Sequence, residues 1–256
     1  MKVKVYEEIK EYCKILKLQG FLKNFEEEIE ESEGYEDFLH KLLLHELEVK
    51  DQRAIDRRVK AAKFPYRIYL NDLKKDFLPM DMQQELPELS TLNFIEEGRN
   101  IIMTGNPGTG KTACAIALGL KACERGYKVL FVTIPQLVTI LKENRNNETL
   151  SRYERLFEKY DLVIADELGY TKIDQDGANL LFNNMSLRVN RKSTIITTNH
   201  LFQRWTEVFK DPTTAAAMAD RLSYRAIAVN MEGESYRLRM TMLERELKAN
   251  KNKGAQ

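Results

Sequence analysis

The stretch Gly105-Asn106-Pro107-Gly108-Thr109-Gly110-Lys111-Thr112 decides the fold of this chain. It matches the phosphate-binding loop pattern, in which a glycine is followed by four residues and then by Gly-Lys-Ser/Thr, without a mismatch. Residues 100–104 before it are typical of a short buried strand, and residues 113–123 after it predict an alanine-rich amphipathic helix. Because strand, glycine loop and helix follow in the required order, a chance glycine-rich turn is a poor explanation, and the stretch predicts a nucleotide-binding core.

The residue types in this loop suit a polyphosphate. Glycines let the backbone approach the ligand closely, so that successive N–H groups can turn inward around its phosphates. The N-terminus of the following helix adds unsatisfied N–H groups and the positive end of the helix dipole. We expect Lys111 to contact the outer phosphates and the Thr112 hydroxyl to hold a magnesium ion. The expected ATP-binding residues are Gly105, Asn106, Pro107, Gly108, Thr109, Gly110, Lys111, Thr112 and Ala113.

Two adjacent carboxylates, Asp166 and Glu167, follow the predicted strand 161–165. Ligands of open parallel sheets bind at the carboxyl ends of the strands, so both acids are expected at the phosphate site. Asp166 is expected to hold the magnesium ion, directly or through water, and Glu167 to orient and polarise the attacking water. The alternative is that both acids only cap the next turn.

A third polar residue, Asn199, follows the predicted strand 193–198. In a parallel sheet it would lie beside Glu167, positioned to orient water or to sense the outer phosphate. An asparagine at the end of a strand is also a common turn former, which is the alternative role. No Asn-Lys-x-Asp guanine-recognition motif follows this segment, which argues against a GTPase.

The remaining core alternates between strands and helices. This order is typical of an α/β fold with a parallel sheet that is covered on both faces. The expected elements are a strand over 128–133, helices over 136–143 and 150–160, and a helix over 178–189.

The N-terminal region, residues 1–75, is almost free of glycine and proline and predicts a small helical domain that binds DNA or a partner protein. Its charges are segregated, with glutamates crowded into 26–33 and basic residues into 53–63. Cations at helical spacing either form a solvated helix surface or track the phosphates of a nucleic-acid backbone. Arg53, Arg57 and Lys60 share one such face, and the expected DNA-binding residues are Arg53, Arg57, Arg58 and Lys60.

A proline-containing linker with one helical segment, residues 63–89, leads to the nucleotide core. We expect the ATPase domain over 76–243 and a polar C-terminal tail over 244–256.

Composition narrows the remaining classes of function. Forty basic and thirty-nine acidic residues nearly cancel, so a nucleic acid would have to be bound by a local patch. The three histidines and three cysteines lack metal-ligand spacing, which disfavours zinc chemistry and a Ser-His-Asp triad. No apolar run approaches the roughly 18 residues of a membrane helix, so a cytoplasmic protein without a membrane partner is expected.

Nearly the whole chain resembles the IstB-like branch of the AAA+ ATPases, the ATP-binding helper proteins encoded beside the transposase in one group of insertion sequences. DnaC-type helicase loaders are close cousins of this branch. Many P-loop ATPases share the phosphate loop and the acidic pair, whereas Glu167-Leu168-Gly169-Tyr170 and Gly233-Glu234-Ser235-Tyr236-Arg237 point to this branch. Further similarity lies in residues 194–199 with Trp205, in Ala219-Asp220-Arg221-Leu222, and in the helical leader at 38–47 and 61–65.

The resemblance implies an AAA+ P-loop ATPase domain preceded by a small helical domain, in a homo-oligomer with ATP at the subunit interfaces. An arginine of the adjacent subunit would stabilise charge on the transferred phosphoryl group. Arg221 is the expected arginine finger, and Arg225, expected one turn further along the same helix, is the alternative. Without the resemblance, a surface ion pair would explain either arginine. Little chain follows Arg237, so a full helical lid and a second in-cis sensor arginine are not expected.

The function implied by the resemblance is that of an ATP-hydrolysing helper of a transposase in DNA transposition, acting in the bacterial cytoplasm. It would use ATP and Mg²⁺ and assemble on duplex DNA in an ATP-dependent way, with the transposase as its partner. The alternative is a DnaC-type replicative helicase loader that acts on single-stranded DNA. A small-molecule phosphotransferase is a weaker alternative, because no acceptor pocket or lid is recognisable in the sequence.

Overall fold

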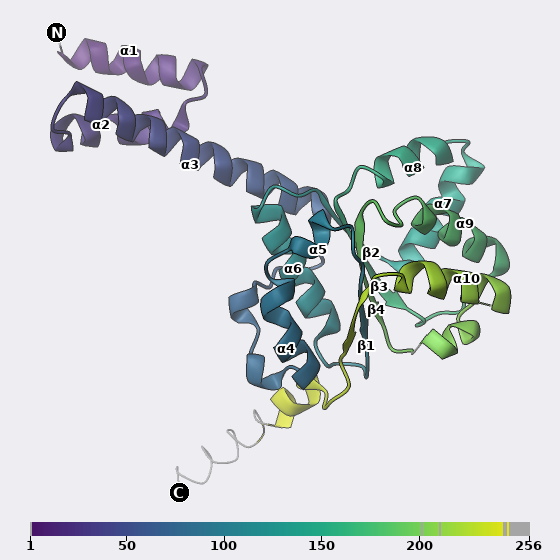
Figure 1. The fold of residues 1–256 in the computed structure, drawn as a ribbon. Helices are drawn as coiled ribbons and strands as arrows, with labels where there is room; N and C mark the ends of the chain where they lie inside the picture. Colours follow the sequence, from purple (N-terminus) through teal and green to yellow (C-terminus); the bar gives the residue numbers. More distant parts are fainter. Residues whose placement is uncertain (1, 201, 210, 243–244, 246–256) are drawn as a thin grey trace, which may run out of the picture. The chain divides into compact units, whose positions relative to one another are not determined.

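The computed structural model describes residues 2–200, 202–209, 211–242 and 245 (Figure 1). The chain forms two compact units, Met1–Arg57 and Arg58–Gln256. The division falls within the long helix α3 (Tyr35–Ala62). The limit at residue 75 that we predicted for the helical domain lies beyond this helix, in the connecting segment.

The first unit is helical and consists of α1 (Lys2–Ile15), α2 (Gln19–Glu31) and α3 as far as Arg57. Apolar residues at helical spacing predicted these helices, and the Phe25 and Leu42 side chains are almost completely buried between them. The Phe25 ring meets the Tyr6 ring edge-on, with 5.6 Å between the ring centroids. At the start of α2, the Gly20 N–H donates to the Glu46 carboxylate at 2.7 Å, so α3 satisfies one of the free N–H groups of α2.

The second unit is organised around a five-stranded sheet in which every strand pair is parallel. The strands are β1 (Ile101–Thr104), β2 (Val129–Thr133), β3 (Leu162–Leu168), β4 (Ser193–Thr198) and β5 (Ile227–Asn230). Their order is β2-β3-β4-β1-β5, so β4 lies between β1 and β3. The carboxyl ends of these three strands therefore meet at one edge of the sheet, where open parallel sheets bind ligands.

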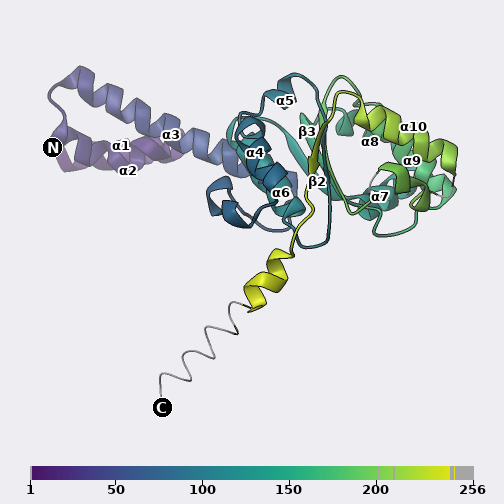
Figure 2. The ribbon, with the colours of Figure 1, turned by 60° about the horizontal axis from the view of Figure 1, so that its bottom comes forward.

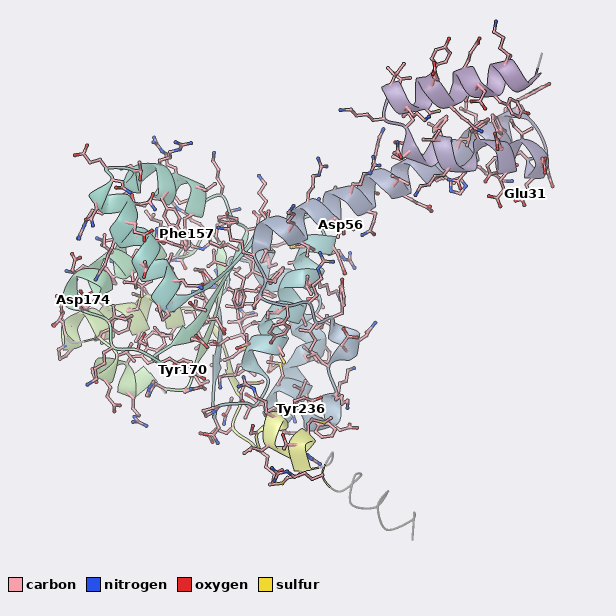
Figure 3. All side chains as sticks on the ribbon, turned by 180° about the vertical axis from the view of Figure 1, so that it is seen from behind. Glu31, Asp56, Phe157, Tyr170, Asp174 and Tyr236 are labelled. Atoms are coloured by element: carbon pink, nitrogen blue, oxygen red, sulfur yellow. The ribbon has the colours of Figure 1, made fainter. Side chains whose placement is uncertain are left out.

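Helices cover both faces of this sheet (Figure 1; Figure 2). One face carries α4 (Met80–Leu89), α5 (Asn93–Glu96) and α6 (Lys111–Glu124), and the other carries α7 (Ile134–Asn146), α8 (Leu150–Phe157), α9 (Gln175–Ser186) and α10 (Pro212–Ser223). Short 3-10 turns are η1 (Leu70–Asp72), η2 (Lys75–Phe77) and η3 (Phe202–Glu207). Phe157 and Asp174 lie on the α7–α10 side and Tyr236 on the other (Figure 3). Phe157 belongs to a large hydrophobic cluster that also completely buries Trp205 and Phe209.

The predicted α/β fold with a parallel sheet is confirmed, although some element ends differ from the prediction. Helix α9 begins at Gln175, earlier than the predicted 178, because the Asp174 carboxylate caps it by accepting the Gly177 N–H at 3.0 Å. Strand β5 was not predicted, since it is an edge strand of only four residues and is only partly buried. None of the helices that the structure describes is long and apolar enough to cross a membrane.

Candidate nucleotide-binding and catalytic site

The predicted phosphate loop lies between the end of β1 and the start of α6. Gly108 has a positive φ of 83°, and a Cβ atom there would lie 2.2 Å from the Ser235 hydroxyl oxygen. At Gly105, a Cβ atom would lie 2.3 Å from the Met231 carbonyl group. Both positions require glycine because the C-terminal segment 231–237 packs directly against the loop.

Lys111 is the first residue of α6 and is only 6% exposed. Its ammonium group donates to the carbonyl oxygens of Gly105 and Asn106, each at 2.7 Å, which holds the side chain across the loop. Burial lowers the pKa of Lys111 to about 8, while the Asp166 carboxylate opposes this shift and the Arg237 charge adds to it. A phosphate group in the loop would stabilise the charged form of this lysine.

The Asp166 carboxylate joins the acidic pair to the phosphate loop. It is 3% exposed and accepts hydrogen bonds from the Thr112 hydroxyl, at 3.0 Å to one oxygen and 3.3 Å to the other. The Thr197 hydroxyl on β4 donates to it at 2.5 Å. Magnesium prefers such hard oxygen atoms, so Thr112 and Asp166 fit the ion. No cluster of three or more His, Cys, Asp or Glu suited to a metal occurs among the described residues, so water and phosphate oxygens would supply the other ligands.

Glu167 occupies a strained position next to this carboxylate. Its φ is +65°, in the left-handed region that costs a non-glycine residue about 1 kcal/mol or more. The register between β3 and β4 shifts between Ala165 and Leu168, which indicates a bulge at this point. The Glu167 N–H donates to the Thr197 hydroxyl at 3.0 Å. Within the described part of the chain, its half-buried carboxylate has no hydrogen-bond or ion-pair partner and remains available to water or a ligand.

Asn199 directly follows β4 at the same edge of the sheet. Its neighbour Thr198 is in register with Leu168 on β3, and the Thr198 carbonyl accepts the Gly105 N–H at 3.3 Å. The end of β4 is therefore bonded to the end of β3 on one side and to the phosphate loop on the other. Asn199 lies directly after this point. Its Oδ1 atom is buried and finds no hydrogen-bond partner among the described residues, so a water or ligand donor would satisfy it.

The C-terminal segment 231–237 brings an additional cation to the loop. The Tyr236 N–H donates to the Gly108 carbonyl at 2.9 Å, and Arg237 follows directly. The Arg237 charge is near enough to lower the pKa of Lys111. We did not expect an in-cis arginine here from the sequence, but the short connection after β5 and the contact with Gly108 bring Arg237 to the loop.

A small apolar cavity of about 80 Å³ borders the loop. Its walls include Leu73, Phe77, Gly110 and Tyr236. The Phe77 and Tyr236 rings meet edge to face with 5.6 Å between centroids, and the Arg239 guanidinium lies 4.5 Å from the centre of the Phe77 ring. These contacts form an aromatic wall beside the phosphate loop. Leu73 and Phe77 fall within the predicted linker, and no sequence motif marks them as binding residues.

The predicted arginine finger, Arg221, is exposed on α10. Its guanidinium lies 4.3 Å from the centre of the Phe182 ring and donates to the Ser186 hydroxyl, both on α9. The prediction that the alternative, Arg225, lies on the same helix is wrong. Helix α10 ends at Ser223, and Arg225 has a φ of +54°.

The four predicted DNA-binding cations lie on α3 but differ in their surroundings. Arg53, Arg57 and Lys60 are exposed at helical spacing, and none has an ion-pair partner within the described part of the chain. Arg58 is half-buried and donates from Nε to the Cys123 carbonyl at 2.7 Å, in the last turn of α6. There its charge offsets the negative end of the helix dipole.

Comparison with known proteins identifies related sequences along nearly the whole chain. The family described as IstB-like ATP binding protein matches residues 12–244. A relative from Geobacillus stearothermophilus, named for an ATP-binding protein of insertion sequence IS5376, is 36% identical over 244 residues, which cover 94% of this chain and 97% of the relative. A relative from Pseudomonas aeruginosa, named for an ATP-binding protein of insertion sequence IS21, is 35% identical over 206 residues, or 80% of this chain and 78% of the relative.

Solved structures share the fold over part of this chain. The crystal structure of DnaI aligns with a TM-score of 0.55 at 20% identity and covers 64% of this chain and 91% of DnaI. AMPPCP-bound DnaA from Aquifex aeolicus aligns with a TM-score of 0.56 at 18% identity, over 73% of this chain and 56% of DnaA. These likenesses concern the fold alone, and they confirm the predicted AAA+ P-loop fold.

Proposed function

The chain belongs to the family of IstB-like ATP-binding proteins, and on this basis we propose that it is an ATP-hydrolysing, DNA-binding helper of a transposase in DNA transposition. The observation that supports hydrolysis is the junction between the phosphate loop and the acidic pair, where the Thr112 hydroxyl lies 3.0 Å from an Asp166 carboxylate oxygen. Glu167, the next residue, offers a carboxylate that has no partner among the described residues, at the same edge of the sheet.

Each residue of the site then has a separate task. Residues 105–113 bind the phosphates of ATP, and Lys111 exchanges its two carbonyl partners for phosphate oxygens. Thr112 and Asp166 would hold a magnesium ion, which would supply positive charge to stabilise the phosphates. Glu167 takes the attacking water as its hydrogen-bond donor and polarises it, and Asn199 fixes the water or the outer phosphate. Arg237 adds positive charge within the same subunit.

Hydrolysis is completed by a second copy of the chain. Arg221 is exposed and its contacts with Phe182 and Ser186 are weak surface contacts, so it is free to exchange them for a phosphate on a neighbouring subunit. In this arrangement ATP lies at the interface of a homo-oligomer, and each active site contains residues of two subunits.

DNA and a transposase are the proposed partners. The exposed cations Arg53, Arg57 and Lys60 form a stripe that suits the phosphates of duplex DNA, whereas Arg58 contributes less because it bonds to Cys123. The relatives' names tie them to bacterial insertion sequences, which supports a transposase partner and a location in the bacterial cytoplasm. The second candidate is a helicase loader acting on single-stranded DNA, and the fold shared with a DnaA that is bound to single-stranded DNA favours it.

Two substitutions test the ATPase site. Lys111→Ala is expected to abolish ATP binding, because the loop loses its buried cation. Glu167→Gln is expected to preserve ATP binding but to lower the rate of hydrolysis by at least about a hundredfold, because the water loses its base. Binding is measured by titration calorimetry and hydrolysis by phosphate release. A Lys111→Ala protein with normal hydrolysis would overturn the site.

The DNA proposal is tested by titrating labelled duplex and single-stranded DNA at one fixed salt concentration, with ATP, with ADP and without nucleotide, while light scattering follows complex size. Large ATP-dependent complexes on duplex DNA support the transposition helper, and tighter binding to single strands supports the helicase loader. Exchanging Arg53, Arg57 and Lys60 for glutamine should weaken binding and reduce its salt dependence by a slope of about 0.9 per lost phosphate contact. The matched control exchanges Lys14, Lys17 and Lys23, exposed cations of α1, its following turn and α2, for glutamine.

A further inference from the structure

The first unit carries an apolar groove that has no part in the ATPase site. The groove encloses about 470 Å³ between α1, α2 and the beginning of α3. Phe21, Ile29, Phe38 and Leu39 contribute to its walls. Ile29 is 42% exposed and Leu39 is 52% exposed, although both are large apolar side chains. Water therefore covers apolar surface that a partner could bury.

The rim of this groove is strongly acidic. Glu28 and Glu33 line it, and every Lys/Arg/Asp/Glu residue between positions 24 and 40 is an acid. Glu31 lies at the end of α2, where the chain turns toward α3 (Figure 3). A negative field of this kind repels nucleic acid and attracts basic segments of proteins.

Only some of these acids have a cation inside the molecule. Glu26 pairs with Lys10 at 2.8 Å, and Asp37 pairs with Lys41 at 3.0 Å. Glu28, which is nearly buried, bonds to the His45 ring at 2.8 Å. The others have no ion-pair partner within the described part of the chain, and they are Glu27, Glu30, Glu31, Glu33 and Glu36.

Two of these unpaired acids, Glu30 and Glu31, do not stabilise the helix that carries them. Glu30 and Glu31 occupy the last turn of α2, which contains no basic residue. Carboxylates there face the negative end of the helix dipole, which is an unfavourable placement. Neighbouring like charges add to this cost. Glu30 and Glu31 thus oppose the local fold, which points to a function outside it.

We propose that the groove binds a basic amphipathic helix of a partner protein. The apolar side chains of that helix, spaced at i, i+3 or i+4 and i+7, would enter the groove beside Ile29 and Leu39. Its lysines and arginines would pair with Glu33, which lines the groove, and with the other unpaired acids of the same segment. The sign of the charge selects this occupant, because the rim attracts a basic segment and repels an acidic one.

The direct test uses the full chain and three labelled synthetic peptides of about 20 residues, long enough to form an isolated helix. The first has leucines along one helical face and lysines on the other. The second carries glutamate in place of each lysine, and the third has the composition of the first with the leucines scattered around the helix. Fluorescence anisotropy should give a dissociation constant for the first peptide that is at least about tenfold lower than for the other two.

Single substitutions locate the binding surface. Ile29→Glu and Leu39→Glu place a charge in the groove and should weaken the binding of the first peptide by about tenfold or more. The matched control, Ile15→Glu, changes an apolar residue that is 74% exposed and does not line the groove, and it should leave binding unchanged. Glu33→Lys should weaken binding and reduce its salt dependence, whereas Glu11→Lys on α1 should not.

The same variants separate this proposal from the ATPase and DNA proposals. ATP hydrolysis and duplex binding should remain unchanged in Ile29→Glu and Leu39→Glu, and circular dichroism should report intact helices. Equal binding of the basic and acidic peptides, or no binding of either, would overturn the proposal. So would a self-associated wild-type chain that Ile29→Glu and Leu39→Glu dissociate, because the occupant of the groove would then be a second copy.

Discussion

Thr197 and Asp166 lie on neighbouring strands, and the Thr197 hydroxyl donates a hydrogen bond to the Asp166 carboxylate at 2.5 Å. The same hydroxyl oxygen accepts the backbone N–H of Glu167 at 3.0 Å. The Thr197 side chain on β4 therefore holds two groups in place. One is the carboxylate of Asp166, which fits the metal, and the other is the backbone of Glu167, whose carboxylate would activate water. Thr197 acts on the site through these two acids and is a positioning residue.

Replacing Thr197 with valine should lower kcat for ATP hydrolysis by about tenfold to a hundredfold, because both hydrogen bonds are lost while the volume is retained. Thr197→Ser keeps the hydroxyl and should retain most of the activity. The affinity for ATP should change less than kcat, since the phosphate loop is untouched. Equal activity of the valine and serine variants would show that Thr197 does not position the acids.

ATP affinity should fall as the pH rises above about 8. Burial lowers the pKa of Lys111 to about 8 in the free protein, so the lysine begins to lose its proton there. A bound polyphosphate raises that pKa, because it favours the charged form. Binding then takes up a proton, and the association constant decreases with pH, by up to about tenfold per unit. Titration calorimetry in buffers of different ionisation enthalpy between pH 7 and 9.5 measures this uptake directly. A flat profile through this range would contradict the lowered pKa.

The Arg188 guanidinium is the main buried cation of the second unit outside the nucleotide site. It is 1% exposed and donates to the carbonyl oxygens of Phe157, Tyr160 and Ser193 at 2.8–2.9 Å. These bonds join the end of α8 to the start of β4. Burial lowers its pKa to about 10, so it remains charged at neutral pH.

Arg188→Met should lower the free energy of unfolding by about 3 kcal/mol, because buried carbonyl groups lose their donors. Urea denaturation measures the loss. Arg191→Met is the control, since Arg191 is exposed nearby, and it should change stability by less than about 0.5 kcal/mol. Similar midpoints for the two variants would mean that water replaces the guanidinium.

The phosphate loop, Asp166 and Glu167 could be predicted from the sequence, because each belongs to a local motif that directly follows a predicted strand. Such motifs could not find Thr197, since a threonine inside a β-strand is common and its importance arises only when β4 lies beside β3. Arg237 was missed for a related reason, because its approach to the loop depends on the unpredicted β5. The error at Arg225 came from extending helical periodicity past Ser223, where α10 ends.

Mixing two inactive variants tests whether Arg221 acts on a neighbouring subunit. Arg221→Ala and Glu167→Gln should each hydrolyse ATP poorly alone. In mixed assemblies, a Glu167→Gln subunit supplies an intact Arg221 and an Arg221→Ala subunit supplies an intact Glu167. When the variants are equimolar, these two residues face each other at about a quarter of the interfaces. Phosphate release should therefore recover and reach a maximum near equal proportions. Lys111→Ala mixed with Glu167→Gln provides the control, because both residues belong to the same side of the site and no intact interface can form. The absence of recovery at every ratio would place the action of Arg221 within its own subunit or outside catalysis.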